Sequence, residues 1–238
     1  MKFLNNLLDA FNFVISPPIC VLCSTLIDTS LCESEHICND CYRNLPPAIE
    51  SKEILNRFAV NFTNYPNPFE YAFSLFNSRD NHKYLEIIHY LKYTKYKKIG
   101  YFLGRKLGQK INNILKEGNL QIDFIVPVPI HKVRKRERGF NQSEVISESI
   151  SIETGIPVGN DILVRNIYTQ SQTKLDLEGR KKNVESAFSL GKDFGLVYGN
   201  NFLIVDDVIT TGSTLFYCAR ILKETGAKNL YLAVITTA

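Results

Sequence analysis

The sequence predicts an α/β fold, in which helices flank a parallel sheet and a small metal-binding element precedes it. Two strand–turn–helix units, in residues 123–154 and 202–226, predict the sheet, because each has an aliphatic run before a polar turn and a helix start. Paired cysteines within residues 20–41 predict the metal-binding element. The chain has 238 residues, 45% of them apolar and 22% charged, so we expect one to two domains with a substantial core.

The first segment, residues 1–17, has apolar residues at helical spacing before Pro17-Pro18, which predicts an amphipathic helix. Packing of this helix on its own protein is favoured over docking on a membrane surface. The chain has no apolar run of about 18 residues, and no signal-peptide cleavage pattern follows its start. We therefore expect a cytoplasmic protein with no transmembrane segment.

Five of the six cysteines lie within residues 20–41. Four of them form two CxxC pairs: Cys20, Cys23, Cys38 and Cys41. Such pairs supply four thiolates to a tetrahedral Zn²⁺ ion, and disulfides are rare in a reducing cytoplasm. No βαβ pattern surrounds them, which argues against a redox site, so we expect a structural zinc element over residues 18–48. Cys32 and His36 leave the ligand set open, because either could replace one of the four.

A stretch rich in proline and asparagine, residues 49–68, is expected to be an irregular linker to a domain over residues 69–238. Within this domain, alternating aromatic and aliphatic residues predict a strand at 69–76. Residues 84–115 are expected to be helical, with an interruption near 95–98. Three glycines on one face of that helix predict close packing against another backbone. They are Gly100, Gly104 and Gly108.

A basic segment follows the predicted strand at residues 123–128. It leads to Asn141, whose side chain is expected to cap a helix that extends to about Thr154. Arginine binds phosphate through paired hydrogen bonds, so the segment suits a diphosphate; a solvated basic surface turn is the alternative. The residues assigned to the diphosphate are Pro129, His131, Lys132, Arg134, Arg136, Arg138 and Gly139.

The second strand–turn–helix unit carries an acidic pair and a hydroxyl-rich turn. Asp206 and Asp207 are expected to close a buried strand that starts at Phe202, and a helix is expected from Leu215 to Lys223. The backbone N–H groups and helix dipole at such a turn make a phosphate cradle. The cradle residues are Thr210, Thr211, Gly212, Ser213 and Thr214. The carboxylates suit a sugar diol, or a Mg²⁺ ion shared with that sugar.

This pattern of aliphatic strand, Asp-Asp, two residues and Thr-Thr-Gly-x-Thr resembles the phosphoribosyl-pyrophosphate (PRPP) loop of type I phosphoribosyltransferases. The resemblance implies a type I phosphoribosyltransferase-like parallel sheet flanked by helices, with a zinc-ribbon-like element before it. It also implies that Asp206 and Asp207 hold the ribose hydroxyls and that the turn binds the 5′-phosphate. Purine-salvage members carry an aspartate where this chain has Thr210, so the usual base for a purine is absent and that reaction is disfavoured.

Further motifs narrow the resemblance to the ComF family of competence proteins. They are Val126-Pro127-Val128-Pro129, Arg138-Gly139-Phe140-Asn141-Gln142, Gln172-x-x-Leu175, Arg180-x-x-Asn183, Ala187-Phe188, Leu91-Lys92-Tyr93 and the four-cysteine element. The resemblance covers the chain from about Pro18 to its end. It implies a part in natural transformation, in which single-stranded DNA is handled at the inner face of the membrane.

Two functions are compatible with this resemblance. The first is a phosphoribosyltransferase that binds PRPP with Mg²⁺ and transfers the phosphoribosyl group to an unknown acceptor, with a mobile loop closing over the site. The residues assigned to that loop are Gln172, Lys174 and Arg180. No N-terminal catalytic cysteine is present, so glutaminase activity is not expected. The second is a non-catalytic competence factor, peripheral at the inner membrane, that binds nucleotides and single-stranded DNA and works with DNA-uptake proteins.

Overall fold

The structure, a computed structural model, describes residues 17–79, 81–93, 96–118, 120–167 and 187–238. Four parallel strands form the central sheet in the order β1-β6-β5-β2, and β3 pairs with β4 in a separate antiparallel ribbon. The strands are β1 (Tyr71–Asn77), β2 (Phe124–Pro127), β3 (Leu163–Arg165), β4 (Phe188–Leu190), β5 (Phe202–Ile209) and β6 (Leu230–Thr237). The helices described are α2 (Asn39–Arg43), α3 (Ser51–Asn61), η1 (His82–Tyr84), α4 (Leu85–Tyr90), α5 (Lys97–Lys116), α6 (Lys132–Arg138), α7 (Gln142–Thr154), η3 (Phe194–Leu196) and α9 (Ser213–Glu224).

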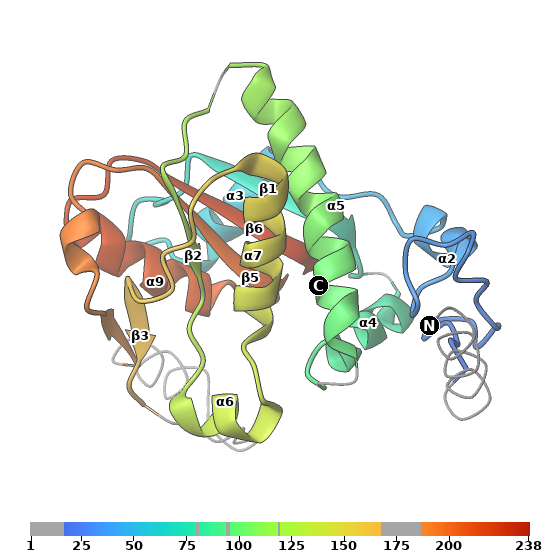
Figure 1. Ribbon diagram of the computed structural model, residues 1–238. Helices are drawn as coiled ribbons and strands as arrows, with labels where there is room; N and C mark the ends of the chain where they lie inside the picture. Colours follow the sequence, from blue (N-terminus) through green and yellow to red (C-terminus); the bar gives the residue numbers. More distant parts are fainter. Residues whose placement is uncertain (1–16, 80, 94–95, 119, 168–186) are drawn as a thin grey trace.

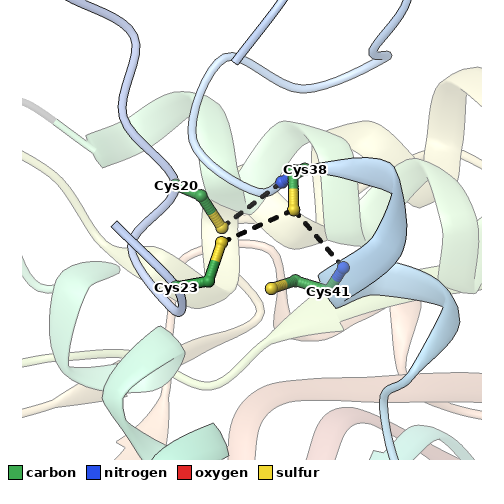
Figure 2. Close-up of side chains that lie close together, drawn as sticks. All are labelled: Cys20, Cys23, Cys38 and Cys41. Atoms are coloured by element: carbon green, nitrogen blue, oxygen red, sulfur yellow. Dashed lines mark hydrogen bonds between the residues drawn. The ribbon is translucent and has the colours of Figure 1, made fainter. Parts of the chain in front are cut away.

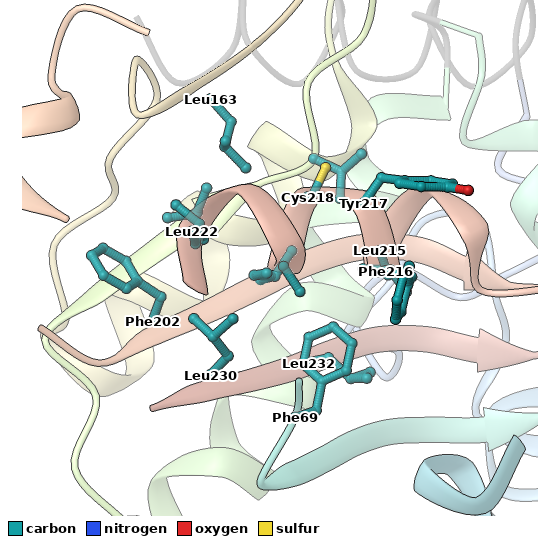
Figure 3. Packing of buried hydrophobic residues seen from close by; sticks show 14 of the residues in the cluster. Phe69, Leu163, Phe202, Leu215, Phe216, Tyr217, Cys218, Leu222, Leu230 and Leu232 are labelled. Atoms are coloured by element: carbon teal, nitrogen blue, oxygen red, sulfur yellow. The ribbon is translucent and has the colours of Figure 1, made fainter. Parts of the chain in front are cut away.

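Helices cover both faces of the sheet, as the sequence predicted (Figure 1). Side chains of a strand alternate between its faces. Phe202 and Ile204 of β5 accordingly lie in the core shared with α3 and α9, part of which is drawn in Figure 3. Leu203 and Val205 lie in the opposite core, with α5 and α7. The carboxyl ends of β2 and β5 meet at one edge, where the two predicted phosphate-binding segments begin.

α5 and α7 pack closely through the glycines that the sequence singled out. A Cβ atom built on Gly104 would lie 2.7 Å from the Cβ of Ser149 and 3.0 Å from the carbonyl oxygen of Ile146. Gly100 and Gly108 face the same helix in the same way. The predicted close approach of another backbone is confirmed.

The segment before β1 is not irregular throughout. Residues 51–61 form α3, whose Ile54 and Phe58 are 0% and 2% exposed and lie in the same core as α9. The expectation of an irregular linker is therefore wrong over these residues, because two apolar side chains one turn apart anchor a helix against the sheet. The division into domains at residues 17, 48 and 68 stays a prediction. No helix in the described ranges is long and apolar enough to cross a membrane.

We predict that Gly104→Ala destabilises the protein, although alanine favours a helix by about 1 kcal/mol over glycine. The added methyl has no room against α7, so we expect a net loss of about 1–3 kcal/mol in the free energy of unfolding, measured by urea denaturation. Gly195→Ala is the matched control, since nothing lies within 4 Å of the position of its added carbon. Equal stability of the two variants would contradict the proposed close contact.

Candidate functional site

The acidic pair lies near the carboxyl end of β5. The strand continues through Ile209, so Asp206 and Asp207 lie within it, and the expectation that they close the strand is corrected. Asp206 accepts a hydrogen bond from Ser143 of α7 and acts electrostatically on Cys218 of α9, whereas Asp207 interacts with Lys92 and Arg138. The acidic pair is therefore surrounded by groups from both faces of the sheet.

Two hydrogen bonds hold Asp206. The hydroxyl of Ser143 and the backbone N–H of Asp207 donate to its Oδ1, at 3.0 and 2.9 Å. Burial, and then the charge of Asp207, nevertheless raise the pKa of Asp206 to about 8. Burial also raises the pKa of Asp207, against the opposing charges of Lys92 and Arg138. At neutral pH these surroundings favour the protonated form of Asp206.

The hydroxyl-rich turn is the N-terminal end of α9. Gly212 is the N-cap residue, with φ of 79° in the left-handed region that favours glycine. Thr211 Oγ1 and Ser213 Oγ lie 3.0 Å apart and share a hydrogen bond. Thr210 and Thr211 are exposed, whereas Ser213 and Thr214 are half-buried. The predicted cradle residues therefore gather at one helix N-terminus, directly after the acidic pair.

The basic segment after β2 contains a helix where the sequence suggested a loop. α6 begins after His131, whose Nδ1 accepts a hydrogen bond from the N–H of Val133 at 3.2 Å. It ends at Gly139, which has φ of 79°. The helix has no apolar periodicity, so only its two caps mark it in the sequence.

The cations of α6 differ in exposure. Arg134 and Arg138, four residues apart, are half-buried, whereas Lys132 and Arg136 are exposed. Burial and the charge of Arg134 lower the pKa of Arg138, and the charge of Asp207 opposes them. Arg138 is thus close enough to the acidic pair to interact with it electrostatically. Of the other residues assigned to the diphosphate, Pro129 and His131 are half-buried and Gly139 is exposed.

Sequence reasoning missed three residues that interact with the acidic pair: Ser143, Lys92 and Arg165. Ser143 follows Asn141, whose Oδ1 accepts the N–H of Ser143 at 3.1 Å, so the helix-capping signal pointed to it. The guanidinium of Arg165 lies over the ring of Phe188, 5.1 Å from its centroid. No local pattern in the sequence marked Arg165, and the Leu91-Lys92-Tyr93 motif pointed to the family without giving Lys92 a role in the site.

The residues assigned to a mobile loop, Gln172, Lys174 and Arg180, lie outside the described residues. The antiparallel ribbon of β3 and β4 flanks the segment that contains them. Their role stays a prediction.

The four paired cysteines converge, as Figure 2 shows. Their Sγ atoms all lie within 4.8 Å of one another. A tetrahedron with Zn–S bonds of about 2.3 Å has edges of about 3.8 Å, and the Sγ atoms of Cys23 and Cys38 are 3.8 Å apart. The cluster is therefore compatible with zinc. Among the described residues Cys32 and His36 do not join it, and the ring of His36 instead packs edge-on against Tyr96 at 5.2 Å.

The cysteine element is attached to α5. Glu35 pairs with Lys98 at 2.7 Å and Glu33 with Lys106 at 2.8 Å. The ring of Tyr42 meets that of Phe102 at 5.1 Å. The buried Cys20, Leu22, Ile27 and Ile37 belong to the same core as β1 and α5. The element is thus part of the main body of the protein.

Comparison with known proteins identifies relatives of this chain. Residues 103–238 match the family described as "Phosphoribosyl transferase domain". The chain is 35% identical to the "DNA utilization protein YhgH" of Salmonella typhimurium over 142 residues, 59% of this chain and 61% of that protein. It is also 35% identical to "Competence protein F" of Haemophilus influenzae over 108 residues, 45% of this chain and 47% of that protein. These matches confirm the resemblance noted in the sequence.

The chain thus spans about half to three fifths of the length of these two relatives. Among solved structures, it is similar to the glutamine PRPP amidotransferase of B. subtilis. The TM-score is 0.41 and the identity 19%, and the match covers 62% of this chain and 30% of the other.

We predict that the purified protein carries one zinc ion per chain, bound by the four converging thiolates. Cys20→Ser should lose the metal and lower the melting temperature by more than about 5 °C, because a structural zinc contributes several kcal/mol to folding. Metal content by mass spectrometry and thermal unfolding measure both effects.

Cys32→Ser is the control for this experiment, since Cys32 is a fifth cysteine of the same segment and lies outside the four-cysteine group. It should retain full metal content. Loss of zinc from Cys32→Ser would show instead that Cys32 is a ligand.

We predict that Asp206→Asn stabilises the protein at pH 8. The pKa of Asp206 is raised from the ordinary 3.8 to about 8 in the folded state. Between these two pH values the folded protein keeps the proton of Asp206, whereas the unfolded chain has lost it. Asp206 therefore makes stability fall as pH rises through this window. The neutral amide avoids this loss, and a gain of about 2–4 °C in melting temperature is expected at pH 8, shrinking towards pH 4. A gain that is equal at both pH values would contradict the raised pKa.

Proposed function

Because this chain belongs to the phosphoribosyl transferase domain family, we propose that it binds PRPP with Mg²⁺ at the carboxyl edge of the sheet and transfers the phosphoribosyl group. The observation that carries this proposal is the meeting of three groups at one edge. They are the acidic pair of β5, the hydroxyl-rich turn before α9, and the half-buried Arg134 and Arg138 of α6. Ligands of open α/β sheets bind at this edge.

Each group suits one part of the ligand. Asp206 and Asp207 would accept hydrogen bonds from the ribose hydroxyls, and the turn would donate backbone N–H groups to the 5′-phosphate. Arg134 and Arg138 would bind the diphosphate. Zinc, held by the four cysteines, has a structural role because four thiolates leave no open position for a substrate.

The transfer reaction would break the bond between ribose C1′ and the diphosphate oxygen, which leaves with the electron pair. The acceptor forms the new bond to C1′ and gives up a proton. Bound Mg²⁺ would offset the charge of the leaving diphosphate. Protein residues contribute mainly by orienting the ligand and by stabilising the negative charge with Arg134 and Arg138. Thr210 occupies the position at which purine-salvage members carry an aspartate, and a threonine cannot act there as the general base for a purine. We therefore propose an acceptor other than a salvaged purine.

We also propose that this activity is associated with DNA uptake, because relatives of the chain carry the names competence protein and DNA utilization protein. Under this proposal the protein acts in the cytoplasm, with peripheral attachment at the inner membrane and DNA-uptake proteins as partners. The acceptor is not identified.

A second candidate function is a non-catalytic factor that binds nucleotides and single-stranded DNA. The exposed Lys132 and Arg136 of α6 favour it, since exposed cations can bind a phosphate backbone. The two uses of α6 therefore involve different side chains.

We predict that the intact protein binds PRPP in the presence of Mg²⁺ in isothermal titration. Asp206→Ala/Asp207→Ala should weaken binding at least about tenfold, because each carboxylate provides charge-assisted hydrogen bonds to the sugar. Asp161→Ala/Asp193→Ala, which removes two carboxylates from the neighbouring segments before β3 and after β4, should bind as the intact protein does. Absence of heat from the intact protein would contradict the proposed function.

The two candidate functions are distinguished by neutralising two different pairs of cations on α6. Lys132→Gln/Arg136→Gln should weaken single-stranded DNA binding and reduce the slope of log affinity against log salt by about 1–2, with PRPP binding unchanged. Arg134→Gln/Arg138→Gln should instead weaken PRPP binding. If the intact protein shows no DNA affinity at low salt, the DNA-binding alternative is wrong.

A further inference from the structure

α3 reaches the hydroxyl-rich turn from outside the family match, which begins at residue 103. At the exposed C-terminal end of α3, the Nδ2 of Asn61 donates a hydrogen bond to the carbonyl oxygen of Thr211 at 3.1 Å. These two residues are 150 positions apart in the chain. The contact therefore joins the segment expected as a linker to the centre of the candidate phosphate site.

This hydrogen bond fixes the direction of the next N–H group. The peptide between Thr211 and Gly212 is trans and planar, so its carbonyl and its N–H point in opposite directions. Because Asn61 holds the carbonyl on the α3 side, the N–H of Gly212 is turned away from α3. Among the described residues this N–H has no hydrogen-bond partner.

The ring of Phe58 packs against the same peptide at Gly212. A Cβ atom at Gly212 would lie 2.8 Å from the ring of Phe58, and the φ of 79° also disfavours any other residue. The turn is thus held by a side-chain hydrogen bond at Thr211 and by an aromatic ring against Gly212.

α3 is itself attached to the helix that the turn begins. The ring of Phe62, which follows α3, stacks on that of Phe216 in α9 at 4.0 Å with an interplanar angle of 1°. Arg220 of α9 lies over the ring of Tyr65 at 5.5 Å. Asn61 therefore acts from a support that is fixed relative to the turn.

We propose that Asn61 is a positioning residue, whose amide holds the Thr211 carbonyl so that the N–H of Gly212 faces the 5′-phosphate of a phosphoribosyl ligand. This inference rests on the proposed function. It assigns to α3 a role in orienting a phosphate-binding N–H, in addition to its contribution to the core. Backbone N–H groups in such a turn bind anions only when they are oriented together.

The test compares two asparagines of the same segment. Asn67 also donates from Nδ2 to a backbone carbonyl, that of Leu55, at 3.1 Å, and it accepts a second bond from the N–H of Phe69. Asn61→Ala should weaken binding of ribose 5-phosphate about three- to tenfold, the effect of one lost hydrogen bond. Asn67→Ala should change it less than about twofold, although it loses more bonds. Asn61→Gln, which keeps the donor, should restore part of the affinity.

Two further measurements distinguish a role in orienting the Gly212 N–H from a general loss of structure around the site. In the intact protein, ribose 5-phosphate should shift the ¹H–¹⁵N resonance of Gly212, and this shift should shrink in Asn61→Ala. Binding of inorganic pyrophosphate with Mg²⁺, which the proposed function places at α6, should be the same in both proteins.

The inference alone is overturned if the intact protein binds ribose 5-phosphate and Asn61→Ala binds it equally well. It is also overturned if Asn67→Ala has the same effect, or if pyrophosphate affinity falls in parallel. If the intact protein binds neither ribose 5-phosphate nor PRPP, the proposed function fails and this inference fails with it.

Discussion

Partial burial of two adjacent carboxylates at the edge of the sheet is the constraint on which the site depends. A carboxylate with little water around it is costly unless hydrogen bonds and opposite charges surround it. Here the surroundings compensate only in part. Ser143 donates to Asp206, and Lys92 and Arg138 act on Asp207, yet the pKa values of both carboxyls stay raised. A ligand that brings sugar hydroxyls or a cation would supply the missing stabilisation, which couples ligand binding to proton release.

The scaffold places these partners with little freedom. Ser143 reaches Asp206 from the first turn of α7, and α7 is fixed against α5 by a contact that leaves no room for a side chain at Gly104. The cysteine element in turn is joined to α5 by two ion pairs and a shared core. α3 supports the hydroxyl-rich turn on the other face of the sheet. The segments outside the family match thus contact the elements that build the site.

Local patterns were sufficient to predict the unit around β5, the cap at Asn141 and the convergence of the four cysteines. Elements without such a pattern were missed. α6 has charged residues all around it, so no periodicity reveals it, and β3 and β4 are only three residues long. The contact of Ser143 with Asp206 joins residues 63 positions apart, and such pairings follow from the packing of helices on the sheet rather than from neighbouring residues. Arg165 and Lys92 interact with the acidic pair for the same non-local reason.

The most direct test of the central claim is the number of protons released when PRPP and Mg²⁺ bind. It is obtained by titration calorimetry near pH 7 in buffers of different ionisation enthalpy. If Asp206 is protonated in the free protein and must ionise to accept hydrogen bonds from the sugar, binding should release about one proton per ligand. The release should disappear in Asp206→Asn if that variant still binds. Binding without proton release in the intact protein would contradict the account.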